Sequence, residues 1–258
     1  MIGVFGGSGF YELLADARPV EVDTPFGAPA SPAMVGSIDG TEVAFMPRHG
    51  VNHEFPPHRI PYRANVWAMN ELGVTRIVAP TAVGSIYPDY APGEFVVPDQ
   101  LVDRTWGRSG TFYDGPQTHH IAFADPYCPD LRQRAAEAVN SVAGSVHEGG
   151  TTVVVQGPRF STRAESASYA AAGWHLLNMT QLPEAALARE LGICYANIAV
   201  VTDYDVGVPG DVAPVTHDEV LEKFGQALAT LRRILTVLAP AVDGDRRLKC
   251  DCRNGVPT

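Results

Sequence analysis

The sequence predicts a three-layer α/β/α fold, with helices on both faces of a central sheet that is mixed and largely parallel. Apolar runs of strand length alternate with segments of helical periodicity along the 258 residues. This alternation is typical of the crossover connections that join parallel strands. Small or polar residues follow most of the apolar runs, and α/β folds bind their ligands at such strand ends. Because no repeat or linker interrupts the pattern, we expect a single domain over residues 1–258.

In the first half of the chain, the clearest predicted element is a helix over residues 61–73. Pro61 suits the first helical turn, and Gly73 suits the position just after the last turn. Residues 81–85, Thr-Ala-Val-Gly-Ser, are interpreted as a tight loop. Short apolar runs bounded by turn residues predict strands at 1–7, 41–47, 74–80 and 94–105.

In the second half, the last helix has the clearest start. Thr216 and Glu219 form a Thr-x-x-Glu capping box, and Val215 and Val220 are placed for a hydrophobic staple. The other predicted elements are helices over 129–144 and 181–192, strands over 151–156, 173–180 and 193–203, and a Gly-Pro break at 157–158 before a further helix start.

The charge of the chain limits its partners. The formal net charge is −10, whereas nucleic acids and anionic membranes attract basic surfaces, so neither is expected as a partner. No apolar run approaches the roughly 20 residues that span a bilayer, and no basic leader precedes the first strand. We therefore expect a cytoplasmic enzyme. If its substrate is an anion, the site must build local positive potential against the overall charge.

The four cysteines do not form a recognisable metal motif. Cys128 and Cys194 stand alone in apolar segments and are interpreted as structural thiols. Cys250 and Cys252 form the sequence Lys-Cys-Asp-Cys, whose spacing is too short for a zinc knuckle and which no second Cys or His pair accompanies. A vicinal redox pair and two idle thiols in a tail both remain open.

Two motifs near the N-terminus favour an anion. Residues 6–9, Gly-Gly-Ser-Gly, lack the third glycine of a dinucleotide fingerprint, so they predict an anion-binding turn with the Ser8 hydroxyl or a plain tight turn. Arg48 and His49 follow a strand and could be a surface pair or an oxyanion clamp. A metal site at His53 and the nearby His58 is not expected, because no carboxylate or cysteine stands at ligand spacing.

Asp203 and Asp205 end a long apolar run. Residues two apart on a strand point to the same face, so these carboxylates are expected side by side. A glycosidase pair would instead come from separate strands that face each other across a bond. Two interpretations remain open: either the two carboxylates are held side by side to bind hydrogen-bond donors of a ligand, or they mark a solvated strand end.

Several segments together resemble the trimeric purine nucleoside phosphorylases, and within them the methylthioadenosine phosphorylase branch. They include Gly-Pro-Arg-Phe-Ser-Thr-Arg-Ala-Glu-Ser at 157–166, Asn-Met-Thr-Gln-Leu-Pro-Glu at 178–184, and the stretch 47–65 around Arg48 and His49. The resemblance extends from residue 1 to about residue 240. It implies the α/β fold of that family and an assembly of three subunits, or a dimer of such trimers.

The resemblance implies that inorganic phosphate attacks C1′ of 5′-methylthioadenosine or adenosine, giving free base and a (5-methylthio)ribose 1-phosphate. Phosphate is then a co-substrate, and no metal or organic cofactor is expected. The alternatives are a phosphorylase for 6-oxopurines (inosine or guanosine), a hydrolase that uses water, and a non-catalytic nucleoside-binding protein.

The resemblance also assigns roles to residues. Asp203 and Asp205 are expected to be catalytic and to read the base, with Asp203 at N7. The expected phosphate site consists of Ser8, Arg48, His49, Thr81, Ala82 and Thr180. The expected ribose and base contacts are Phe160, Ser161, Met179, His53 and His217, with His120 contributed by a neighbouring subunit.

Two of these assignments point to different substrates. Relatives that act on 6-oxopurines carry Asn where this chain has Asp203, so Asp203 favours a 6-aminopurine. His217 matches a residue that holds a ribose 5′-hydroxyl, which favours adenosine over methylthioadenosine. Cys250 and Cys252 resemble a Cys-x-Cys redox pair of some heat-stable relatives.

Overall fold

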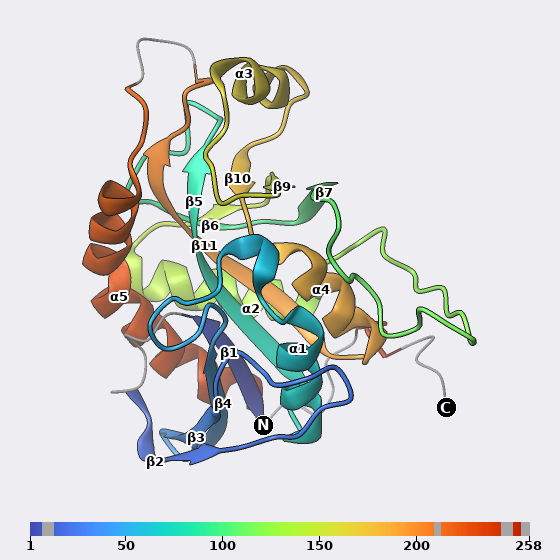
Figure 1. Cartoon of the computed structure of the whole chain (residues 1–258). Helices are drawn as coiled ribbons and strands as arrows, with labels where there is room; N and C mark the ends of the chain where they lie inside the picture. The colour runs from blue at the N-terminus through green and yellow to red at the C-terminus, as the bar shows by residue number, and fades with distance from the viewer. Residues whose placement is uncertain (7–12, 209–212, 244–249, 254–258) are drawn as a thin grey trace.

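The computed structural model describes four stretches of the chain, namely residues 1–6, 13–208, 213–243 and 250–253. Within them, the strands join in one sheet with helices on both faces (Figure 1). The strands are β1 (Ile2–Gly6), β2 (Ala15–Val20), β3 (Ala33–Ile38), β4 (Thr41–Pro47), β5 (Arg76–Ser85), β6 (Phe95–Val97), β7 (Gln100–Arg104), β8 (His147–Glu148), β9 (Thr151–Val155), β10 (Leu176–Asn178) and β11 (Cys194–Tyr204).

The centre of the sheet is parallel. β1 lies between β4 and β5, and β5 also pairs with β11, all in parallel register. Antiparallel pairs attach β3 to β4, β10 to β5 and β6 to β11. β2 forms one edge; its residues are mostly exposed and include Asp16, Arg18 and Pro19. The predicted mixed, largely parallel sheet is therefore confirmed.

Helices cover both faces of this sheet, as predicted. They are α1 (Tyr62–Glu71), α2 (Pro129–Ala143), α3 (Arg163–Ala171), α4 (Gln181–Glu190) and α5 (His217–Asp243). α1 and α4 pack against one face, on a core that contains Phe5 and Ile77. α2 and α5 pack against the other face, where Val4 and Val78 point. Neighbouring residues of β1 and β5 thus enter opposite cores, which explains why the central strands are continuous apolar runs.

The helix boundaries follow the sequence signals. α1 begins just after Pro61, and Gly73 beyond its end has a φ of +81°. At the start of α5, the Thr216 N–H donates to Oε2 of Glu219 at 2.8 Å, and the Glu219 N–H donates to Oγ1 of Thr216 at 3.3 Å. These reciprocal bonds confirm the predicted capping box.

Two predictions about strands are wrong. Residues 81–85 are not a loop, because β5 continues to Ser85 and stays paired with β11, a partner more than 100 residues away. The segment 94–105 is two strands rather than one. Pro98, which has no N–H to donate, interrupts it, so β6 pairs with β11 while β7 pairs with β9.

The unequal lengths of the central strands open one end of the sheet. β1 and β4 end side by side, with Gly6 opposite Pro47. Val4 lies opposite Val78 of β5, so this end is level with Pro80. β5 and β11 continue past it as a pair to Ser85 and Tyr204. On this side of β5, the edge left by β1 stays uncovered until β10 pairs with Gly84 and Ser85. Thr81 and Ala82 lie at this opening.

Among the described residues, no helix is both long and apolar enough to cross a membrane. The cytoplasmic location and the single domain over residues 1–258 stay predictions.

Candidate active site

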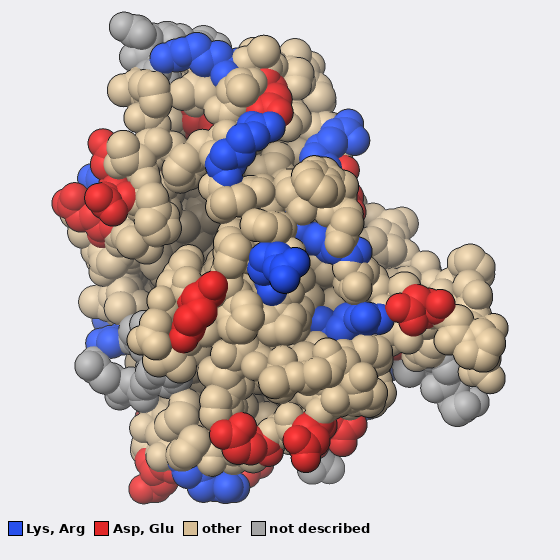
Figure 2. All heavy atoms as spheres, viewed as in Figure 1, with Lys and Arg blue, Asp and Glu red and all other residues tan. Residues whose placement is uncertain are grey.

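A cavity of about 940 Å³ lies at this open end, between the central sheet and the first turns of α5. Figure 2 shows the face hollowed beside α5, with mostly uncharged atoms around the hollow. The cavity brings together most of the predicted site residues: Arg48, His49, His53, Thr81, Ala82, Phe160, Met179, Thr180, Asp203, Asp205 and His217. These residues come from six separate parts of the sequence.

Three predicted residues are not part of this group. Ser161 lines a separate pocket of about 190 Å³ beside Arg159 and Glu165, although the preceding Phe160 lines the main cavity. The side chains of these two neighbouring residues thus enter different pockets. His120 is exposed on the segment between β7 and α2 and does not line the cavity. Ser8 lies outside the described residues.

The Arg48 guanidinium is already engaged by the protein. Nε and Nη2 donate to the two carboxylate oxygens of Glu184 at 2.9 and 3.0 Å. Nη2 also donates to the Phe5 carbonyl and Nη1 to the Pro80 carbonyl, both at 3.2 Å. Although burial lowers the pKa of Arg48, Glu184 raises it overall. The fork expected to grip phosphate thus holds Glu184, and Arg48 has one Nη1 hydrogen left to offer.

His49 is a neutral imidazole. Burial, together with the Arg48 charge, lowers the pKa of His49 to about 3. Its Nδ1 lies 2.8 Å from the Phe55 carbonyl, to which it donates a hydrogen bond, so Nε2 is left as an acceptor. The ring stacks on His53, with centroids 4.3 Å apart. The expected oxyanion clamp is corrected accordingly: His49 offers a lone pair and no positive charge.

Two threonine hydroxyls can donate to an anion: that of Thr81 is free to do so, and that of Thr180 donates to Oδ1 of Asn178 over a long 3.4 Å and can turn to an anion instead. Oγ1 of Thr81 accepts from Nδ2 of Asn197 at 2.9 Å, which leaves its own hydrogen free to point elsewhere. At the start of α4, Oδ1 of Asn178 accepts the backbone N–H groups of Thr180 and Gln181 at 2.7 and 2.8 Å. Because these N–H groups are occupied, the threonine side chains are what the cavity can offer here. Asn178 was not among the predicted site residues.

Asp203 and Asp205 flank Gly84 of β5. A methyl group at Gly84 would lie 3.0 Å from Oδ2 of Asp203 and 3.6 Å from Cβ of Asp205. The prediction that both carboxylates share one side is therefore confirmed. A β-bulge between Val201 and Asp203 shifts the register of β11 here. Because the bulge precedes both carboxylates, it sets where they meet β5 and leaves their alternation unchanged.

The Asp203 carboxyl is held ready to carry a proton. Burial, reinforced by the Asp205 charge, raises the pKa of Asp203 to about 6, against a hydrogen bond from Thr202 that lowers it. The Thr202 hydroxyl lies 2.7 Å from Oδ1 of Asp203 and 3.2 Å from the Val83 carbonyl. It can donate to the carboxylate, or accept from the protonated acid while donating to Val83. Both protonation states of Asp203 are thereby accommodated, and nothing in the sequence pattern points to Thr202.

Asp205 is buried more deeply, with 3% of its surface exposed. Burial raises the pKa of Asp205, although a hydrogen bond from Ser166 lowers it. Among the described residues, its Oδ1 has no hydrogen-bond partner. A buried acceptor without a donor is costly, so this oxygen is a place where a ligand N–H would bind favourably.

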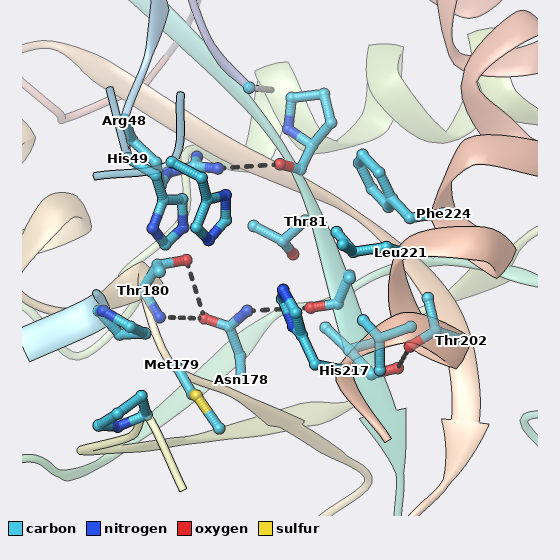
Figure 3. A pocket seen from close by; sticks show the side chains of 18 of the residues that line it. Arg48, His49, Thr81, Asn178, Met179, Thr180, Thr202, His217, Leu221 and Phe224 are labelled. Carbon is cyan, nitrogen blue, oxygen red and sulfur yellow. Dashed lines mark hydrogen bonds between the residues drawn. The ribbon is translucent and has the colours of Figure 1, made fainter. Parts of the chain in front are cut away.

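α5 supplies an apolar wall that sequence reasoning did not assign to the site. Val220, Leu221 and Phe224 line the cavity together with His217 at the helix start. Figure 3 shows Leu221 and Phe224 on the side of the cavity where α5 passes, across from Met179. In the sequence, these positions form an apolar stripe of helical spacing, which could equally have been a core stripe.

Gly84 leaves room for the Asp203 carboxylate, and Gly84→Ala tests this. The added methyl group would press on Oδ2 of Asp203, and a displacement of 1 Å can cost about 10²-fold in rate. We expect kcat/KM for the reaction at this site to fall by about 10-fold, less than 10²-fold because the shift is smaller than 1 Å. Gly110→Ala is the control, because its nearest neighbour would lie 3.7 Å away. Equal activity of both variants would contradict the placement.

Residues 1–239 match the family model of the phosphorylase superfamily. The chain belongs to the phosphorylase superfamily. This superfamily member is 52% identical over 247 residues to the S-methyl-5′-thioadenosine phosphorylase of Mycolicibacterium smegmatis, and the match covers 95% of this chain and 93% of the relative. The resemblance drawn from the sequence motifs is therefore confirmed.

Solved structures resemble this superfamily member over almost its whole length. A methylthioadenosine phosphorylase from an antarctic soil metagenomic library matches with a TM-score of 0.92 and 35% identity, over 99% of this chain and 90% of that one. The methylthioadenosine phosphorylase of Schistosoma mansoni in complex with adenine matches with a TM-score of 0.90 and 38% identity, over 96% and 93% of the two chains. The predicted fold is the fold of these enzymes.

Proposed function

We propose that this chain catalyses the phosphorolysis of 6-aminopurine nucleosides, with 5′-methylthioadenosine as its first substrate and adenosine as its second. Inorganic phosphate attacks C1′ and releases the base and a (5-methylthio)ribose 1-phosphate. The names of the relatives, and the adenine bound to the Schistosoma mansoni enzyme, support this substrate class. The observation that carries the proposal is the Asp203 carboxyl, whose pKa of about 6 lets it hold a proton inside the cavity.

The two carboxyl groups recognise the base and donate a proton to it as it leaves. As the bond to C1′ breaks, negative charge flows into the purine, and a proton donor at N7 lowers the barrier. Asp203 is that donor. The unpartnered Oδ1 of Asp205 accepts an N–H of the 6-amino group. A 6-oxo oxygen would leave this acceptor without a donor, which costs about 1–3 kcal/mol.

Phosphate binds at the level of Pro80, below the sugar. The Thr81 and Thr180 hydroxyls donate to its oxygens, Arg48 supplies positive charge and one N–H, and Nε2 of His49 accepts the hydrogen of a protonated phosphate oxygen. Ala82 and Ser8 complete the proposed phosphate contacts. The phosphate anion then stabilises the cationic sugar of the transition state. This chemistry requires only phosphate as co-substrate.

The sugar lies on Met179. A methyl group at Gly157 would come within 2.6 Å of the Met179 sulfur, so the thioether is seated on this glycine and faces the cavity. Phe160 borders the base and His53 the sugar. His217, whose ring is 5.9 Å from that of His53, stands at the 5′ end of the nucleoside.

The 5′ end has two kinds of surface, which explains why both substrates are proposed. The apolar wall of α5 suits a methylthio group, and the His217 ring can hydrogen-bond a 5′-hydroxyl. We expect Leu221→Ser to lower the ratio of kcat/KM for methylthioadenosine over adenosine by about 10-fold, the worth of one apolar contact in a pocket. His217→Ala should raise the same ratio. Because Leu221 is half exposed, its replacement spares the fold. Parallel shifts of the ratio in both variants would contradict this assignment.

The proposed function is tested by measuring base release from methylthioadenosine, adenosine and inosine, each with and without phosphate. Phosphate-dependent release of adenine, fastest from methylthioadenosine, is the expected result. Release without phosphate would identify a hydrolase. Cleavage of inosine alone would identify a 6-oxopurine phosphorylase, and binding without any cleavage would identify a nucleoside-binding protein.

We also propose that three copies of the chain associate and that His120 completes a neighbour's site. The segment between β7 and α2 extends away from the body of the molecule (Figure 1), and its His120 and Trp106 are exposed. The proposed partner is a second copy of this chain, whose site His120 would enter. The mass in solution, measured by analytical ultracentrifugation, tests this assembly.

A further inference from the structure

The cysteines of the chain converge on one place. The sulfur atoms of Cys128, Cys194, Cys250 and Cys252 all lie within 4.8 Å of one another, and the chain has only these four cysteines. Cys128 and Cys194 are buried free thiols, as interpreted from the sequence, but they do not stand alone, because Cys250 and Cys252 lie beside them. No signal in the sequence relates positions so far apart.

Two of the four sulfurs are fixed by the backbone. Cys128 caps the N-terminus of α2, where its Sγ accepts the Leu131 N–H at 3.5 Å. Its own N–H donates to the Tyr195 carbonyl at 2.8 Å, which ties this cap to the start of β11. The N–H of Cys194 donates to the Thr75 carbonyl at 3.1 Å. These bonds hold Cys128 and Cys194 in place as one preformed half of a site.

The C-terminal segment supplies the other half. Cys252 is 3% exposed and packs in the same core cluster as Cys128 and Cys194, and Cys250 packs against that cluster while keeping some exposure. All four are free thiols. The Cys194 and Cys250 sulfurs are 3.5 Å apart, much farther than the length of about 2.05 Å that a disulfide requires.

Four thiols at these separations match the geometry of a bound metal. In a tetrahedral zinc site with Zn–S bonds of about 2.3 Å, neighbouring sulfurs are about 3.8 Å apart. The sulfur separations, 3.5 Å for Cys194 and Cys250 and at most 4.8 Å overall, lie on both sides of this value, so only small shifts are needed to reach that arrangement. Four thiolates favour zinc or iron over hard cations such as magnesium, and zinc is the usual metal of closed sites with four cysteines.

We propose that Cys128, Cys194, Cys250 and Cys252 form a structural zinc site that fastens the C-terminal segment to α2 and β11. Binding forms four Zn–S bonds and releases the thiol protons to solvent, with no change in oxidation state. Cys194 and Asp203 are nine residues apart on β11, which corresponds to roughly 30 Å of strand. The zinc site is therefore remote from the proposed active site and does not depend on the proposed function.

The test is the metal content of the full chain, produced with zinc in the medium and purified anaerobically with reductant. We expect one zinc per chain by mass spectrometry of the metals, and cobalt replacement should give the d–d absorption of a tetrahedral thiolate site. Cys250→Ser and Cys252→Ser should each lose the metal. His53→Ala should retain it, because His53 lines the cavity and is not part of the cysteine cluster. A chelator should lower the melting temperature of the wild type but not of Cys252→Ser.

Four results would overturn the proposal. The first is a wild-type chain without zinc and with four titratable thiols. The second is a pair of disulfides in protein that was alkylated anaerobically, which would indicate redox pairing. The third is iron or copper in place of zinc at equal supply. The fourth is zinc that persists in both Ser variants and is lost in His53→Ala.

Discussion

Asp203→Asn is expected to lower kcat for 5′-methylthioadenosine by about 10²- to 10⁴-fold, the range over which a positioned proton donor accelerates a reaction. An amide keeps the shape of the side chain and can donate a hydrogen bond, but it cannot transfer a proton to N7. Because an amide N–H can also pair with a 6-oxo oxygen, kcat/KM for inosine relative to methylthioadenosine should rise. Asp89→Asn, at an exposed aspartate beyond β5, is the matched control.

The pH profile distinguishes a proton donor from a merely structural carboxyl. Burial raises the pKa of Asp203 to about 6, so the acid form is lost as pH rises through that value. In the wild type, kcat/KM should fall along this limb, and in Asp203→Asn the limb should be absent. An unchanged limb in the variant would show that another group supplies the proton.

The same pKa predicts that Asp203→Asn increases stability although it lowers activity. The carboxyl titrates near pH 4 in the unfolded chain and near 6 in the folded one. The folded state therefore disfavours the ionised form, and the cost begins above pH 4 and is complete above pH 6. Asp203→Asn should thus raise the free energy of unfolding at pH 8, by on the order of 2–3 kcal/mol, and leave it nearly unchanged at pH 4. Denaturant unfolding at both pH values measures this.

Glu184→Ala is expected to lower the free energy of unfolding by about 3–5 kcal/mol, because it leaves a buried guanidinium without its counter-ion. Glu184 and Arg48 are 1% and 4% exposed, and the Tyr195 hydroxyl also donates to Oε1 of Glu184 at 2.8 Å. For a chain of this size, the melting temperature should fall by roughly 10 °C. The double variant Arg48→Met/Glu184→Leu should regain much of this loss, since an apolar pair can replace a buried ion pair.

An exposed ion pair provides the control for this prediction. Nη1 of Arg63 lies 2.8 Å from Oδ2 of Asp114, whose side chain is 64% exposed, so Asp114→Ala should cost less than about 1 kcal/mol. The double variant should also bind phosphate poorly despite its stability, because it has no Arg48 charge. Similar losses in Glu184→Ala and Asp114→Ala would contradict the view that burial sets the cost.

The sequence was informative where a signal is local. The capping box of Thr216 and Glu219 needs only four residues to define it, and Asp203 and Asp205 mark the end of an apolar run that is visible without a structure. Most of the residues that the resemblance assigned to the site line the cavity. These features depend on neighbours in the chain or on patterns that relatives share.

What the sequence could not predict depends on partners far along the chain. Pro80 and Gly84 resemble loop residues, yet pairing with β11 keeps their segment in β5. The fork of Arg48 is occupied by Glu184, which is 136 positions away. The neutrality of His49 follows from its burial. Each outcome was fixed by tertiary contacts that no local pattern contains.

The exposed edge of the sheet has a consequence for solubility during folding. An edge strand with free N–H and C=O groups is a template on which a second chain can add and begin an aggregate. β2 carries Asp16 at a positive φ of 53°, the charged Arg18, and Pro19, which has no N–H. A charge, a bend and a missing donor each oppose the addition of a further strand. Growth by strand addition is thereby discouraged at this edge of the sheet.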